Sequence, residues 1–224
     1  MRYTLLLLAF MALSATTLQA QLGIRAGYNM NDAPDWVFEG DLNSQADLLS
    51  DGYAFGIDYW LPMRSYRVDF LPELNYGRFS ENALTEAQWF SFFLNTHFYF
   101  LDFEGDCDCP TFSKSGGAFQ KGLFFQLSPG VTYQNATVNE LENEDTEGFW
   151  SYSIGAGLGL DIGVSDFFTI TPIVSYRYFL PSDWQALAVY ENDDPQLPQV
   201  RSSESAINQI YTGVRLGFRF DQRY

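Results

Sequence analysis

Residues 150–164 alternate without interruption between two kinds of side chain, and this alternation limits the fold more than any other feature. Every second residue from Trp150 to Val164 is apolar or aromatic, and the residues between them are Ser, Gly or Asp. Side chains of a β-strand point alternately to opposite faces. The segment therefore predicts a strand with one apolar face and one small or polar face, long enough to cross a bilayer when tilted.

The same period of two recurs in seven further segments, namely 22–29, 52–61, 66–79, 88–101, 121–133, 168–179 and 206–220. Pro72, Pro129 and Pro172 interrupt three of them, and the missing backbone donor predicts a bulge or a local break there. Eight such segments predict an all-β fold, an eight-stranded antiparallel up-and-down transmembrane barrel with its apolar face outward and its polar face inward.

The chain begins MRYTLLLLAFMALSATTLQA, with Arg2 before an apolar run and small residues ending at Ala20. This pattern predicts a cleaved signal peptide over 1–20 and one barrel domain over 21–224. The remaining sequence has no continuous apolar stretch long enough for a membrane helix. An exported chain of this kind can span a bilayer only as a closed barrel, so we expect the bacterial outer membrane as its location and its lipid as a partner.

The charge balance limits the other partners. The chain has 28 acidic and 12 basic residues, a net charge of −16, and this charge disfavours nucleic acid, whose phosphates need a basic surface. Aromatic residues make up 18%, which suits the lipid face and the interfacial girdles of a membrane barrel.

The connections between the strands differ in length. Residues 62–65 and 165–167 are short, whereas 30–50, 135–149 and 180–205 are long and carry five acidic residues each. Outer-membrane barrels keep their long loops outside the cell, and strand parity agrees if the N-terminus is periplasmic. Acidic loops could bind Ca²⁺ or Mg²⁺, but no spacing matches an EF-hand, so a solvated acidic surface is the preferred interpretation.

Residues 102–120 are an exception, because parity makes this long connection a periplasmic insert. It contains the only cysteines, Cys107 and Cys109. An oxidising compartment favours first a local disulfide, then a bridge to a partner, then a metal site. A barrel does not need this insert to close, so it is the candidate contact with a periplasmic or envelope protein.

The inward faces of the predicted strands carry both signs of charge. An eight-stranded barrel has an interior just wide enough for side chains, and charges buried there must be paired. We therefore expect a packed lumen network and not a pore, formed by Arg25, Asp58, Arg67, Asp69, Glu73, His97, Asp161, Arg177, Arg215 and Arg219.

Two motifs suggest chemistry, and both have a simpler explanation. His97, the only histidine, could serve an outer-membrane lipid hydrolase, but alternation points it into the lumen, where a hydrogen-bonded histidine is expected. The glycines at 155, 157 and 159 lie within a predicted strand and lack the helix that a nucleotide-binding loop needs. The sequence thus predicts no catalytic, cofactor-binding or metal-binding residue, and no cofactor.

Several segments resemble the small outer-membrane β-barrel family of the Bacteroidota, often called PorT-like, a distant architectural relative of the OmpA and OmpX barrels. The resemblance covers 22–220 and is carried by LGIRAGYN, YAFGIDYWLP with FLPELNYGRF, YSIGAGLGLDIGVSDFFTITPIVSYRYF and GVRLGFRF. It implies the barrel fold, and one branch of the family is needed for type IX secretion.

The last strand also resembles the terminal-strand signal that the barrel assembly machinery reads. The matching residues are Gly213, Leu216, Phe218 and Phe220, although the chain continues to Tyr224. The resemblance therefore implies this machinery as a partner during biogenesis.

Together these features predict a non-enzymatic outer-membrane barrel with a structural or protein-interaction role. A PorT-like accessory of secretion or envelope assembly, a small-solute channel and a lipid hydrolase are the alternative functions. A soluble lipocalin-like barrel is the alternative fold, and it would need the opposite polarity, with an apolar interior.

Overall fold

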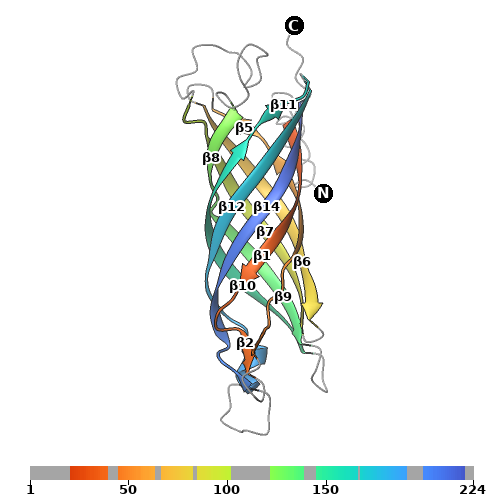
Figure 1. The fold of residues 1–224 in the computed structure, drawn as a ribbon, viewed down its shortest axis with the longest axis vertical. Coiled ribbons are helices and arrows are strands. Elements are labelled where there is room, and N and C mark those ends of the chain that lie inside the picture. The colour runs from red at the N-terminus through yellow and green to blue at the C-terminus, as the bar shows by residue number, and fades with distance from the viewer. Residues whose placement is uncertain are drawn as a thin grey trace, which may run out of the picture.

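The computed structural model describes residues 21–39, 45–63, 67–82, 85–101, 122–138, 145–165, 167–190 and 199–219. Within these ranges the chain forms a closed antiparallel barrel of eight strands (Figure 1), as the sequence predicts. The predicted signal peptide and the insert with Cys107 and Cys109 lie outside the described residues. Of the helical residues described, none belongs to a helix long and apolar enough to cross a membrane.

Five barrel strands are continuous, and three consist of two pieces. The continuous strands are β1 (Gln21–Asp32), β6 (Val68–Asn82), β7 (Thr85–Phe98), β12 (Phe168–Asp183) and β14 (Glu204–Arg219). The divided strands are β4 (Gly52–Tyr59) with β5 (Leu61–Pro62), β8 (Leu123–Leu127) with β9 (Gly130–Val138), and β10 (Asp145–Leu160) with β11 (Ile162–Gly163).

The barrel closes between its first and last strands. β1 pairs with β14 along its whole length, from Gln21 opposite Arg219 to Asp32 opposite Asn208, and its other edge pairs with β4. Every further strand pairs antiparallel with the neighbours that precede and follow it. The described sheet therefore leaves no open edge, which is the condition for strands surrounded by lipid.

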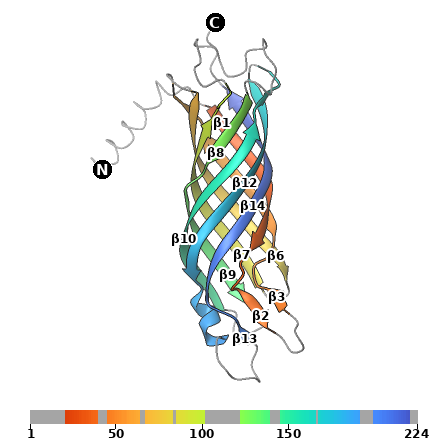
Figure 2. The same ribbon diagram turned by 60° about the vertical axis from the view of Figure 1, so that its left-hand side comes forward.

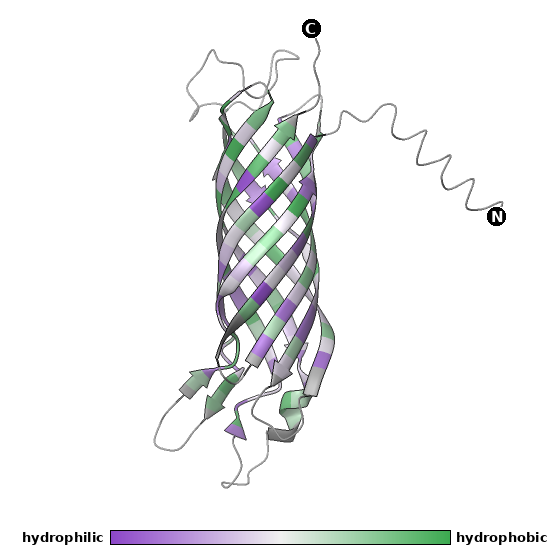
Figure 3. Ribbon diagram, turned by 90° about the vertical axis from the view of Figure 1, so that its right-hand side faces the viewer, coloured by the Kyte–Doolittle hydropathy of each residue, from purple (hydrophilic) through white to green (hydrophobic). Residues whose placement is uncertain are grey.

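The alternation along each strand separates the outside of the barrel from its inside. Trp150 and Ile154 point outward and are 63% and 60% exposed, whereas the intervening Ser151 and Ser153 are buried. Figure 3 shows hydrophobic and hydrophilic residues alternating along the strands. The apolar exterior and polar interior are the reverse of what the lipocalin-like alternative requires.

The three prolines each cause a local break. Pro129 separates β8 from β9, Pro72 lies beside the gap between β4 and β5, and Pro172 lies beside the gap between β10 and β11. Pairing resumes in the same register beyond each proline, so only the local ladder is lost. The register shifts instead between Ser80 and Asn82 and between Phe179 and Ser182.

A small three-stranded sheet lies beyond one end of the barrel (Figures 1 and 2). It contains β2 (Val37–Glu39), β3 (Gln45–Asp47) and β13 (Gln199–Val200), and the 3₁₀ helix η2 (Gln185–Tyr190) lies at the same end. We call this end the loop end. The opposite end, where β1 begins and β14 ends, is the terminal end.

The strands extend farther toward the loop end than the sequence predicts, and the predicted long loop over 135–149 is wrong. β9 continues to Val138, which pairs with Asp145 at the start of β10. The alternation of apolar residues stops before these polar strand ends, so it could not mark them. The short connections predicted at 62–65 and 165–167 do lie between strands at the terminal end, where β7 also ends and β8 begins.

Candidate functional site

Four charged side chains from four adjacent strands meet inside the barrel. Asp58 accepts hydrogen bonds from Arg25 Nε at 3.1 Å and from Arg215 Nη2 at 2.7 Å. Arg25 Nη1 lies 3.2 Å from Glu73 Oε2. These side chains are buried, and they carry two positive and two negative charges. We call them the lumen tetrad, and their charges balance without solvent.

Glycine makes room for the tetrad on the inner face of the sheet. The register places Gly23 opposite both Asp58 and Gly217. A Cβ atom on Gly23 would lie 2.5 Å from Arg215 Nε, and one on Gly217 would lie 2.6 Å from Arg215 Nη1. The guanidinium of Arg215 thus occupies space that any larger residue at either position would fill.

Amide side chains extend the network around the lumen from Glu73. Asn75 Nδ2 and Asn95 Nδ2 donate to the two carboxylate oxygens of Glu73, at 2.8 and 2.5 Å. Asn95 Oδ1 in turn accepts from Gln126 Nε2 at 3.1 Å and from Ser128 Oγ at 2.5 Å. These contacts join β6, β7 and β8, so a continuous hydrogen-bonded path leads from the tetrad to the opposite wall.

His97 belongs to this polar path. Its ring stacks on Phe124 with centroids 3.9 Å apart, and its Nε2 lies 3.1 Å from Gln126 Oε1. The side chain is buried in the lumen. The ring therefore hydrogen-bonds to an amide, and this arrangement differs from a histidine that activates a hydroxyl nucleophile beside an acid.

The other predicted acids lie nearer the terminal end. Asp161 accepts hydrogen bonds from Tyr99 Oη, at 2.5 Å, and from the hydroxyl of Thr171. Arg67 lies over the ring of Tyr99, with its guanidinium carbon 5.0 Å from the ring centroid. Asp69 is buried on the same inward face.

Arg177 makes no hydrogen bond with the tetrad and contacts aromatic rings instead. Its guanidinium carbon is 4.1 Å from the ring centroid of Phe93 and 4.9 Å from that of Tyr211. Its Nη1 donates to Gln209 Oε1 at 3.2 Å. The structure therefore places Arg177 in a different environment from Arg25 and Arg215.

Arg219 ends β14, and its side chain lies outside the described residues.

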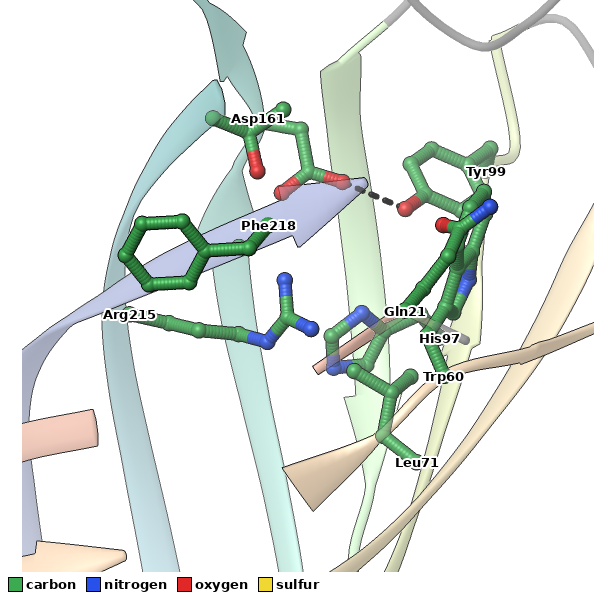
Figure 4. A pocket seen from close by; sticks show the side chains of 10 residues that line it. Gln21, Trp60, Leu71, His97, Tyr99, Asp161, Arg215 and Phe218 are labelled. Carbon is green, nitrogen blue, oxygen red and sulfur yellow. Dashed lines mark hydrogen bonds between the residues drawn. The ribbon is translucent and has the colours of Figure 1, made fainter. Parts of the chain in front are cut away.

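Two small cavities lie beside these groups. The larger, of about 20 Å³, lies near the terminal end between Arg215, His97, Tyr99 and Asp161 (Figure 4). The smaller, of about 10 Å³, is lined by Arg177 and Trp89 among others. Each has room for about one water molecule, so little space is left beside these side chains. Among the described residues, no three His, Cys, Asp or Glu side chains are placed to hold a metal ion.

Aromatic side chains close the lumen at the loop end, and the sequence did not predict this cluster. Trp36 packs against Trp184 with ring centroids 5.6 Å apart, and Trp89 packs against Phe79 at 4.4 Å. We call this cluster the aromatic plug; its buried members are Ala33, Trp36, Leu48, Leu49, Phe79, Ala87, Trp89, Ala136, Phe179, Trp184, Leu187, Val200 and Ile207. Apolar residues inside predicted loops, such as Trp36 and Leu187, were the signal available in the sequence.

Of three comparisons with known proteins, the search of solved structures found matches. A scan against protein-family models found no match, and neither did a search of the curated proteins. Among solved structures, the chain is similar to neisserial surface protein A, with 9% identity, a TM-score of 0.53, and coverage of 91% of this chain and 98% of that one. At this identity the likeness shows the fold alone, which is that of a small eight-stranded outer-membrane β-barrel.

Two further solved structures are similar over most of the chain. The N-terminal barrel domain of OprF from Pseudomonas aeruginosa has 17% identity and a TM-score of 0.44, covering 90% of this chain and 98% of that domain. The attachment invasion locus protein Ail of Yersinia pestis has 14% identity and a TM-score of 0.43, covering 90% and 100%.

Proposed function

We propose that the chain is an integral protein of the bacterial outer membrane with a structural or protein-interaction role and no catalytic one. One observation carries the proposal: the polarity of the barrel is inverted relative to a soluble protein. Exposed residues such as Leu158 and Phe55 cover the outside, whereas Arg25 and Glu73 are buried inside. Such a surface is stable in lipid, and each spanning strand finds its backbone partners within the sheet.

The filled interior supports a role at the ends of the barrel over a role in its lumen. The lumen tetrad and the aromatic plug occupy the interior at different heights. A partner would then meet the small sheet and η2 at the loop end, or the connection between β7 and β8 at the terminal end. We propose that the loop end faces the medium and that the terminal end faces the periplasm.

Membrane fractionation followed by a heat-modifiability gel tests this proposal. Closed barrels that resist detergent migrate faster before boiling than after it, so we expect the protein in the outer membrane with a boiling-dependent shift. Samples without reductant also report on Cys107 and Cys109, since a reductant-sensitive higher band would identify a covalent partner. Recovery in the soluble periplasmic fraction, with the same mobility before and after boiling, would refute the membrane proposal.

A PorT-like accessory of type IX secretion or envelope assembly is the second candidate. It is supported by the resemblance of segments such as LGIRAGYN and GVRLGFRF to the Bacteroidota family. Deletion of 102–120 should then remove co-purifying envelope proteins while the boiling-dependent shift remains. If the same proteins co-purify without the insert, the partner does not bind there.

The terminal-strand signal of Gly213, Leu216, Phe218 and Phe220 stays a prediction, tested by mutating it and measuring assembly.

The channel and the hydrolase are less well supported. The two cavities beside the tetrad and the plug hold only about 20 and 10 Å³, too little for a hydrated solute. His97 contacts Gln126 inside the lumen, away from the lipid that a lipid hydrolase must reach. An outer-membrane activity that disappears in H97Q, with the folded band unchanged, would restore the hydrolase hypothesis.

A further inference from the structure

We propose that the smaller lumen cavity binds a monovalent inorganic anion of about the size of chloride, held chiefly by Arg177. The cavity lies between β1, β6, β7, β12 and β14, next to the aromatic plug, to which Phe79, Trp89 and Phe179 contribute. This inference concerns the interior of the barrel and does not depend on which partner binds its ends.

Arg177 is a buried cation without an ion pair among the described residues. Its side chain is only 1% exposed. Arg25 and Arg215, by contrast, each form an ion pair with Asp58, whereas Arg177 contacts the rings of Phe93 and Tyr211 and one amide oxygen. The Glu73 carboxylate acts on Arg177 only through space, without a hydrogen bond. Aromatic faces and an amide stabilise a guanidinium only partly, and an uncompensated buried charge is strongly unfavourable.

Most of the unpaired polar atoms at the cavity are hydrogen-bond donors. Arg177 Nε and Nη2 and the indole Nε1 of Trp89 are buried and have no hydrogen-bond partner among the described residues. All three atoms can only donate. Among the described residues that line the cavity, Asn29 Oδ1 is the one oxygen that is also buried without a hydrogen-bond partner. A water molecule could accept from these donors and donate to Asn29 Oδ1, but unlike an anion it would not balance the charge of Arg177.

The size of the cavity restricts the class of anion. About 10 Å³ is close to the least space that one water-sized particle needs. A chloride ion is larger than a water molecule, so it fits only when the movable side chains of Gln209 and Asn75, which line the cavity, shift outward. A carboxylate, phosphate or sulfate has several heavy atoms and does not fit. The charge of Arg177 and its unpaired donors therefore favour a single small monovalent anion.

The test measures how chloride affects the stability of the folded barrel. Purified protein in detergent is unfolded thermally while sodium chloride replaces sodium gluconate at constant ionic strength. A ligand that binds only the folded state raises the unfolding temperature, here by about 3–6 °C at tenfold excess over its Kd. The rise should saturate with chloride concentration, whereas a general salt effect on the surface should not.

Variants locate the effect. R177M should abolish the chloride-dependent rise, and W89F should weaken chloride binding by about tenfold because one charge-assisted hydrogen bond is lost. The control is R78M, since Arg78 is a guanidinium whose side chain is 60% exposed near the loop end, and this variant should respond as the wild type does. A rise that persists in R177M would overturn the proposal.

A second measurement uses the wild-type protein alone, in case R177M does not fold. Chloride-35 nuclear magnetic resonance detects bound chloride as excess line broadening, which an added competing halide such as bromide should reverse. We expect broadening that saturates at one site per barrel and is insensitive to sulfate. Equal line widths with and without folded protein would overturn the proposal, whatever the variants do.

Discussion

Asp58 joins two buried guanidinium groups, so its removal tests the lumen tetrad at the scale of a single residue. D58N keeps the size of the side chain but leaves Arg25 and Arg215 facing each other with one carboxylate, that of Glu73, near Arg25. Breaking a buried ion pair in this way costs about 3–5 kcal/mol. We expect the free energy of unfolding, measured by urea titration in detergent, to fall by about that amount.

An exposed ion pair provides the matched control. Arg78 Nη2 lies 2.8 Å from Glu86 Oε1, and the two side chains are 60% and 36% exposed. E86Q should change the free energy of unfolding by less than about 1 kcal/mol, because solvent screens this pair. Equal losses in D58N and E86Q would mean that the tetrad contributes nothing beyond a surface pair.

The sequence identified the charged residues of the lumen but not their partners. Alternation alone places Arg25, Asp58 and Arg215 on inward faces. The contact between Asp58 and Arg215 joins residues 157 positions apart and exists only once β1 has closed against β14. The different environment of Arg177, with aromatic faces and no hydrogen-bonded carboxylate, also depends on that closure. Spacing in the sequence therefore could not reveal it.

At the scale of a strand, the alternation itself can be tested on β10. Leu158 points outward, and its paired neighbours Phe125 and Val174 are exposed on the same face. An arginine on the lipid face of a barrel costs about 2–4 kcal/mol at the middle of the bilayer. L158R should therefore lower the free energy of unfolding in lipid vesicles by that amount and reduce the folded fraction on the gel.

The control for this strand is an outward position that is already polar. Asn208 lies near the loop end of β14, where it pairs with Asp32 and Tyr178. N208R should cost no more than about 1 kcal/mol, because the penalty falls near the interface. If L158R and N208R are tolerated equally well, the outer face of β10 does not contact lipid.

The strands could be predicted from the sequence, whereas the structure at the loop end could not. A period of two is a local property, visible in residues 150–164 without any knowledge of their neighbours. The aromatic plug brings together Trp36, Trp184 and Trp89 from segments far apart in the chain. These residues meet because the connections at the loop end fold back against the barrel. Such contacts leave no periodic pattern in the sequence.

At the scale of the whole molecule, the chain forms a membrane barrel whose lumen is filled. The charges of the tetrad balance one another, amides such as Asn95 and Gln126 satisfy one another, and the plug closes the loop end. Eight strands leave an interior that side chains alone can fill. The ends of the barrel are then the surfaces available to a partner, which is why the proposed function is one of interaction.

Conductance across planar bilayers tests this claim most directly. Purified protein is reconstituted at high potassium chloride concentration. Protein recovered from the same preparation is then tested for the boiling-dependent gel shift, which shows that the inserted protein is folded. The account predicts a flat current at applied voltages, without discrete steps. Reproducible steps whose size increases with salt concentration would contradict it, because they require a continuous water-filled path past the tetrad and the plug.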